Sequence, residues 1–150
     1  MQNGKTYFKS AKTSREYRIT RHYTCESDHI VYVAHCKLCN IDYVGQSTRT
    51  MRARHLGHRG EIRSGADGLG RHFLKHGQGL NLKDETIFEE NIMKHFDLTI
   101  IASVESGQPW TQKKLDDLEG RFQKNLMTMD YHGGMNIRDE NKRKTRRTGT

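Results

Sequence analysis

Residues 30–45 read IVYVAHCKLCNIDYVG, which is two apolar runs separated by a short polar segment. The first run, residues 30–34, is rich in β-branched and aromatic side chains, and residues 41–45 alternate between apolar and polar positions. Both patterns are typical of β-strands. Because the connection is short, the two runs predict an antiparallel hairpin closed by a turn within residues 35–40.

The register of this hairpin decides which side chains meet. A hairpin that folds about the midpoint of residues 37–38 places Tyr32 directly opposite Tyr43, and Ile30 opposite Gly45. Opposed residues share a face of the sheet, so both phenols point the same way, about 5.5 Å apart at Cβ. The pair is either an ordinary cross-strand aromatic contact or two phenols presented to a ligand, with Gly45 leaving that end of the face open.

The chain after the hairpin predicts a helix over about residues 50–64, with Thr48 or Thr50 as its N-cap and Gly65 as its stop. At helical spacing the inward stripe consists of Met51, His55, His58 and Ile62. Four arginines lie on the opposite side, as a solvated basic face or as a surface for nucleic-acid phosphates: Arg49, Arg52, Arg59 and Arg63.

Arg54 belongs to neither side of this helix. It lies at the edge of the inward stripe, one turn before His58, so the two side chains are neighbours. A guanidinium in this position can hold a phosphate oxygen through a bidentate contact, which makes Arg54 a candidate binding residue. For His58, a histidine that is simply satisfied within a partly buried face is the alternative to a role in chemistry.

Further along the chain, the patterns predict a short helix over residues 69–75, a third strand over residues 97–104 and an amphipathic helix over about residues 111–129. Residues 77–94 predict no element firmly. The expected fold is of the α/β (α+β) class. It has a small three-stranded antiparallel sheet flanked by helices, in the order β-β-α-α-β-α.

Glu119 falls within the apolar arc of the last predicted helix. A carboxylate in such a place is unfavourable unless it is paired or bound to a cation. Two partners fit the residue type. One is a hard divalent ion such as Mg²⁺, which prefers oxygen ligands, and the other is a basic side chain such as Arg54.

The cysteines offer a second candidate metal site. Cys36 and Cys39 have the CxxC spacing of a zinc knuckle at the tip of the predicted hairpin, and Cys25 is a candidate third ligand. The alternative is three reduced thiols without metal. His72 and His76 also have a metal-compatible spacing, for which packing or phosphate contact is the preferred interpretation. The fourth zinc ligand would come from His22, His29 or His35.

Positive charge is concentrated at the two ends of the chain. The net charge is +8, with six Lys/Arg and one Glu in residues 1–24, and five Lys/Arg without an acid in residues 141–150. A basic total predicts a polyanion partner, here DNA, and solubilising ends are the alternative. We expect a flexible basic arm over residues 1–27, one domain over residues 28–138 and a basic tail over residues 139–150.

The composition also bears on location. No run of about 18 apolar residues suggests a membrane span, and the polar N-terminus argues against a secretory signal. We therefore expect an intracellular protein with reduced cysteines. The basic tail suggests a nuclear location if the host is eukaryotic, and a cytoplasmic one otherwise.

Several of these features together resemble the motifs of the GIY-YIG nucleases, in the same order. VY at residues 31–32 and YVG at residues 43–45 are similar to the two motifs that name the family. CKLC at residues 36–39 and RHFLKHG at residues 71–77 are most similar to the nuclease domains of Penelope-like retroelements. The helix motif, the metal-binding glutamate and the closing asparagine are matched by Arg54 with His58, by Glu119 and by Asn136.

The resemblance covers about residues 28–138 and implies a metal-dependent endonuclease that hydrolyses DNA phosphodiester bonds with Mg²⁺ or Mn²⁺. It implies no small-molecule cofactor. In the implied reaction Tyr32 is the general base on a water, Tyr43 orients water or phosphate, and Arg54 neutralises charge on the phosphoryl oxygens. Glu119 would hold the metal, and Asn136 would support the site. His58 would help Tyr32 to lose its proton, because the ordinary pKa of tyrosine is near 10.

Two positions depart from the family pattern. Ile30 replaces the first glycine, and residues 46–48 lack the lysine that helps to activate the tyrosine in some members. Two other functions therefore stay open. One is a noncatalytic nucleic-acid-binding module on the same fold, and the other is a zinc-knuckle interaction domain in which the tyrosines only pack.

Overall fold

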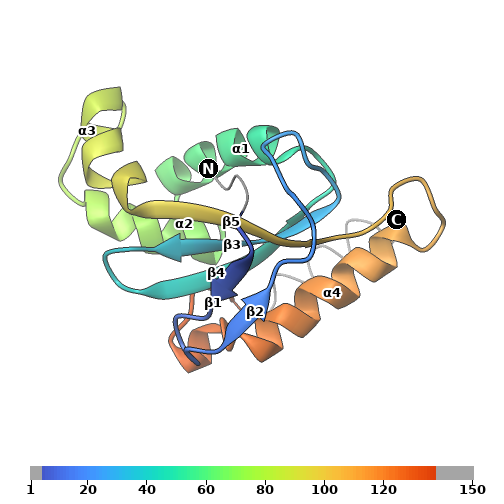
Figure 1. The fold of residues 1–150 in the computed structure, drawn as a ribbon. Helices are drawn as coiled ribbons and strands as arrows, with labels where there is room; N and C mark the ends of the chain where they lie inside the picture. The colour runs from blue at the N-terminus through green and yellow to red at the C-terminus, as the bar shows by residue number, and fades with distance from the viewer. Residues whose placement is uncertain (1–4, 138–150) are drawn as a thin grey trace.

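The hairpin singled out in the sequence forms the centre of the fold. In the computed structural model, which describes residues 5–137, β3 (Ile30–Cys36) pairs with β4 (Ile41–Ser47) on one side and β5 (Phe96–Ser103) on the other. Both pairings are antiparallel. Side chains on both faces of β3 are buried, which explains its nearly continuous apolar run. The expected three-stranded sheet with flanking helices is confirmed (Figure 1).

The register of the hairpin differs by two residues from the predicted one. Tyr32 lies opposite Gly45, and Tyr43 lies opposite Ala34. The predicted pairing of Tyr32 with Tyr43 is wrong because the turn spans residues 37–40 instead of two residues, with Asn40 in the left-handed region (φ 54°). Side chains alternate along a strand, so a shift of two residues leaves both tyrosines on one face.

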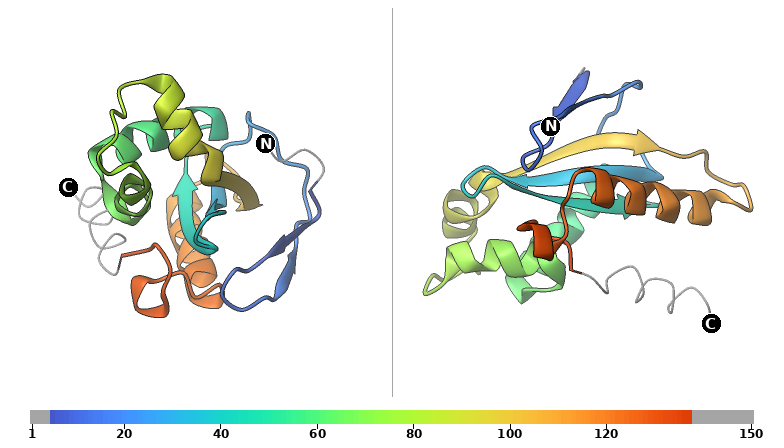
Figure 2. Two further views of the ribbon diagram at one scale, coloured as in Figure 1. Left: turned by 90° about the vertical axis from the view of Figure 1, so that its left-hand side faces the viewer. Right: turned by 90° about the horizontal axis from the view of Figure 1, so that it is seen from below.

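Helix α1 (Met51–Ser64) and helix α2 (Asp67–Leu74) cover one face of the sheet (Figure 2). Helix α1 begins and ends as predicted. The Thr50 side chain accepts a hydrogen bond from the Ala53 N–H, and Gly65 ends the helix in the left-handed region (φ 70°). Helix α2 continues into the 3₁₀ turn η1 (Lys75–Gly77).

Residues 77–94, where the pattern predicts nothing firm, contain helix α3 (Glu85–Asn91) and the 3₁₀ turn η2 (Met93–His95). Helix α4 (Thr111–Asn125) runs beside β4 and ends before residue 129, the predicted end. It leads to the 3₁₀ turn η3 (Asp130–His132). Within the described residues, no helix is long and apolar enough to cross a membrane.

The N-terminal segment is a hairpin rather than the flexible arm that we expected. Strands β1 (Tyr7–Lys9) and β2 (Glu16–Arg18) pair with each other and lie on the face of the sheet opposite α1 and α2 (Figure 2). Their anchors are three widely spaced apolar side chains, which show no periodicity in the sequence: Phe8, Ile19 and Tyr23. The basic tail over residues 139–150 lies outside the described residues.

Candidate active site

Tyr32 lies at the centre of the candidate site, on the face of β3 that α1 covers. Its side chain is fully buried, and Gly45 on β4 leaves the space that the phenol occupies. The hydroxyl lies 2.8 Å from Nε2 of His58 and accepts a hydrogen bond from Nε of Arg54 at 3.2 Å. The fold therefore brings together three residues that the sequence singles out, from one strand and one helix.

The surroundings favour neutral forms of Tyr32 and His58. Burial raises the pKa of Tyr32, the guanidinium of Arg54 lowers it, and the carboxylates of Glu61 and Glu119 raise it again. Burial also lowers the pKa of His58 well below its usual value, and the charge of Arg54 lowers it further. Nδ1 of His58 is buried without a hydrogen-bond partner among the described residues. At pH 7 the phenol therefore contacts a neutral imidazole.

Arg54 reaches along α1 to Glu61, which lies two turns away. Its Nη1 and Nη2 donate to the two carboxylate oxygens at 2.7 and 3.2 Å, a bidentate ion pair. Burial lowers the pKa of Arg54, but the nearby Tyr32 oxygen and Glu61 carboxylate raise it by more, so the net shift is upward. Glu61 is not among the residues predicted from the sequence, although the spacing of seven residues on one helix places it on the same face as Arg54.

Glu119 lies on the buried face of α4, as its position in the apolar arc predicts. Its carboxylate accepts a hydrogen bond from Nε2 of Gln123 at 3.2 Å. The same Nε2 donates to the carbonyl oxygen of Val44 at 3.3 Å, which links α4 to β4. Burial and the Glu61 carboxylate raise the pKa of Tyr32, and the charge of Glu119 adds a smaller contribution in the same direction.

Asn136 fastens the C-terminal segment of the domain to β4. Its Oδ1 accepts from the Val44 N–H at 2.8 Å, and its Nδ2 donates to the Val44 carbonyl oxygen at 2.9 Å. The side chain is fully buried. Tyr43 is also buried, and its ring lies beside Gly45. The described contacts of Asn136 are therefore those of a supporting residue at the edge of the sheet.

Three of the four arginines predicted on the outer face of the first helix form ion pairs, and the fourth, Arg49, lies just before α1. Arg52 pairs with Glu26, while Arg59 and Arg63 contact carboxylates of α3. The guanidinium groups of Arg59 and Arg63 also lie 5.0 and 4.0 Å from the centroid of the Phe88 ring. These two arginines therefore join α3 to α1, and their predicted contact with nucleic acid stays a prediction. The fourth, Arg49, is exposed and has no ion pair with a described residue.

A candidate metal centre lies at the C-terminal end of β3. Ligand atoms of Cys36, Cys39, His72 and His76 all lie within 4.8 Å of one another, so they could hold a metal ion. Sγ of Cys36 and Sγ of Cys39 lie 3.5 and 3.7 Å from Nε2 of His76. Burial, with the charges of His76 and Lys75, lowers the pKa of His72 to about 4.

This cluster corrects the predicted ligand set. Cys25 does not belong to it, since its Sγ accepts a hydrogen bond from Arg52 at 3.4 Å. His29 and His35 also have other partners, because their Nδ1 atoms lie 2.8 Å from Asp28 and 2.7 Å from Asp42. The one-turn spacing of His72 and His76 is the feature of the sequence that points to these two residues as the histidine ligands. Nothing local in the sequence shows that α2 lies against the tip of the hairpin.

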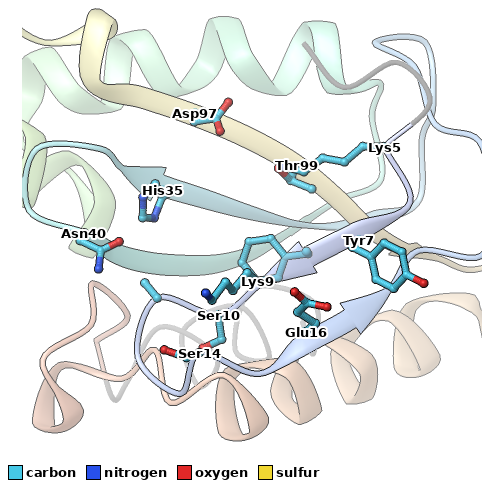
Figure 3. Close-up of a pocket in the computed structure, with 12 residues that line it drawn as sticks. Lys5, Tyr7, Lys9, Ser10, Ser14, Glu16, His35, Asn40, Asp97 and Thr99 are labelled. Atoms are coloured by element: carbon cyan, nitrogen blue, oxygen red, sulfur yellow. The ribbon is translucent and has the colours of Figure 1, made fainter.

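A cavity of about 510 Å³ lies apart from Tyr32. It opens between the N-terminal hairpin and the opposite face of the sheet, and its lining includes Lys5, Lys9, His35 and Asp97 (Figure 3). Both charge signs are present in its lining, and none of the candidate catalytic residues lines it.

Searches of protein-family models, curated proteins and solved structures found no match to this chain.

Proposed function

We propose that this protein is a metal-dependent endonuclease of the GIY-YIG type that hydrolyses phosphodiester bonds in DNA. One observation carries the proposal. The buried phenol of Tyr32 is held between the imidazole of His58 and the guanidinium of Arg54, and the buried carboxylate of Glu119 contributes to its pKa. A base candidate, a phosphate-binding cation and an acidic metal ligand in one place suit hydrolysis of a phosphodiester.

The neutral imidazole of His58 gives the phenol proton a destination. Arg54 already donates to the Tyr32 oxygen, so the phenol O–H is free to donate to Nε2 of His58. In the proposed reaction Tyr32 takes a proton from the attacking water while its own proton passes to His58. Arg54 remains against the oxygen and stabilises the charge that develops there. This pair would replace the activating lysine that the chain lacks.

The residues present also fit a divalent cation at Glu119. The carboxylate is almost fully buried, and a hard cation is one of the partners that offset the desolvation of such a group. A bound Mg²⁺ or Mn²⁺ would supply Lewis-acid stabilisation of the phosphate and the leaving oxygen. The chain's own part is to orient the carboxylate, which Gln123 does from one turn further along α4.

The distribution of unpaired charge supports DNA as the partner. Arg52, Arg59 and Arg63 are neutralised by ion pairs, as described above. Six basic residues of the N-terminal hairpin segment have no ion pair with any residue in the described range; they are Lys5, Lys9, Lys12, Arg15, Arg18 and Arg21. We therefore propose that this hairpin contacts the phosphate backbone.

We further propose that the metal centre is a structural zinc site. Two cysteines and two histidines are a ligand set typical of structural Zn²⁺ sites, which are usually tetrahedral. They come from β3, the adjoining turn and the α2–η1 segment, so a bound ion would tie the tip of the hairpin to these helical turns.

A noncatalytic DNA-binding module is the second candidate. The observation that favours it is the burial of Tyr32 and Glu119, which leaves neither group open to a substrate in the free protein. Cleavage separates the two functions.

The test is nicking of a supercoiled plasmid with Mg²⁺. We expect Glu119→Gln to lower the rate at least about 100-fold while DNA binding persists. The matched control is Asp117→Asn, an equal change of charge at an exposed position of the same helix, which should leave the rate unchanged. Undiminished cutting by Glu119→Gln, or no cutting by the wild type, would refute the proposed function.

A further inference from the structure

Glu61 occupies the hydrogen-bonding edge of Arg54 that the proposed reaction needs for phosphate. A carboxylate and a phosphate engage a guanidinium in the same bidentate way. The Arg54 and Glu61 side chains are 21 % and 24 % exposed, whereas Tyr32, which Arg54 contacts, is fully buried. The ion pair therefore lies between the phenol and solvent, where an approaching phosphate would meet it first.

The backbone of α1 leaves the ion pair accessible. Gly57 is exposed and lies between the two partners, and a Cβ placed there would lie 3.1 Å from Nη1 of Arg54. The guanidinium thus rests beside bare backbone, with no side chain at this position to keep a phosphate oxygen away from Nη1.

We propose that Glu61 is an internal substitute for the scissile phosphate, which holds Arg54 in the free protein and is displaced when DNA binds. This inference rests on the proposed function, in which Arg54 binds that phosphate. The exchange replaces one anion by another on the same N–H groups, so Arg54 keeps a counter-charge throughout. Displacement of Glu61 also removes one of the carboxylates beside Tyr32.

Any phosphate that binds Arg54 must compete with the intramolecular carboxylate of Glu61. Glu61 is attached to the same helix as Arg54, so its local concentration is high, and a single free phosphate competes poorly with it. A long polyanion that is already anchored elsewhere, as on the N-terminal hairpin, delivers its phosphate with a comparable advantage. Glu61 would therefore select extended DNA over mononucleotides.

Binding without cleavage tests whether DNA displaces Glu61 from Arg54. We would measure the Kd of a fluorescein-labelled duplex of about 20 base pairs, without added Mg²⁺ or Mn²⁺, for the wild type and for Glu61→Gln. The control is Glu90→Gln, which makes the same change of charge at an exposed residue of α3 that has no ion pair with a described residue. We expect Glu61→Gln to bind at least about fivefold more tightly than Glu90→Gln. Adding Arg54→Met to both variants should remove that difference.

Equal affinities of Glu61→Gln and Glu90→Gln would overturn the inference. Glu61→Asp provides a second measurement, because it keeps the charge but is one methylene too short for the same bidentate contact, and it should also bind more tightly than the wild type. Plasmid nicking by the wild type tests the proposed function separately. If the wild type cuts DNA but the Glu61 variants bind no more tightly, only this inference is refuted. If the wild type neither binds nor cuts DNA, both the inference and the proposed function are refuted.

Discussion

Gly45 lies directly opposite Tyr32 in the β3–β4 pair, and the phenol of Tyr32 fills the space where a side chain at position 45 would stand. A Cβ placed on Gly45 would lie 2.5 Å from the Tyr32 hydroxyl oxygen and 2.6 Å from the ring carbon that carries it. The two motifs of the hairpin are therefore linked sterically. The glycine of the second permits the rotamer of the tyrosine in the first.

This contact predicts the effect of Gly45→Ala. The added methyl must displace the phenol from His58 and Arg54, so we expect a loss of about 1–3 kcal/mol in the free energy of unfolding, as for other overpacked cores. Nicking should fall at least about tenfold, because the base candidate moves. Urea unfolding and the plasmid assay measure the two effects.

Gly120→Ala is the matched control for Gly45→Ala. Gly120 lies within α4 and has nothing within 4 Å of an added Cβ, so alanine there should stabilise the protein by up to about 1 kcal/mol and leave cleavage unchanged. If the two alanine variants behave alike, the steric link between Gly45 and Tyr32 is not what positions the phenol.

The contrast between paired and unpaired basic residues predicts different salt dependences. Replacing Lys9, Lys12 and Arg15 together by glutamine should lower the slope of log Kd against log salt concentration by about 2 to 3, because each phosphate contact contributes about 0.9. Replacing Arg59 and Arg63 by glutamine should leave the slope unchanged and reduce stability, since these residues hold α3. The reverse result would place the DNA on the outer face of α1.

The metal centre predicts which cysteine matters. Untagged protein should contain about one zinc per chain, and Cys39→Ser should lose the zinc and lower Tm by at least about 5 °C. Cys25→Ser should retain the zinc and the wild-type Tm, because Cys25 lies beside Arg52 and outside the cluster. Elemental analysis measures the zinc content of each variant, and thermal unfolding measures its Tm. Zinc that disappears with Cys25→Ser would restore the ligand set expected from the sequence, and zinc that survives Cys39→Ser would contradict both ligand sets.

The buried imidazole of His58 predicts a loss of stability in mild acid. An unfolded histidine has a pKa near 6.5, whereas burial and Arg54 lower the pKa of His58 in the folded protein. The unfolded chain therefore binds the proton first, so this contribution is fully present above about pH 6.5 and declines as the pH falls. We expect the free energy of unfolding to drop by up to about 2 kcal/mol between pH 7 and pH 5 on account of His58. In urea unfolding, His58→Gln should show a smaller drop, and an unchanged drop would contradict the assignment.

Local signals in the sequence predict the elements well, and long-range packing explains where they fail. The ends of α1 follow from Thr50 and Gly65, whose capping chemistry involves only their neighbours. The register of the hairpin depends on a left-handed Asn40, which the composition of the turn does not reveal. The N-terminal hairpin escapes prediction because Phe8 and Tyr23 gain their burial only by crossing a sheet built from later residues.

The candidate site shows the same division. The positions of Tyr32, His58 and Arg54 follow from strand and helix periodicity, and the hydrogen bonds among them agree. The sequence does not predict Glu61, because a charged residue near the end of a polar helix is expected to be solvated, and its pairing with Arg54 emerges only in the fold. The histidine ligands of the metal centre depend on the approach of α2 to β3, which no local pattern encodes.

The two hydrogen bonds between the Asn136 side chain and the Val44 backbone have a consequence for self-association. Strand β4 is the last strand on its side of the sheet, and an open outer strand is a template for pairing with another molecule. The Met135 N–H donates to the Asp42 carbonyl oxygen, and Asn136 satisfies both backbone groups of Val44, so the segment covers this border as a further strand would. A fragment that stops before residue 135 would expose the border, and oligomers joined through β4 are the form in which we expect to find it.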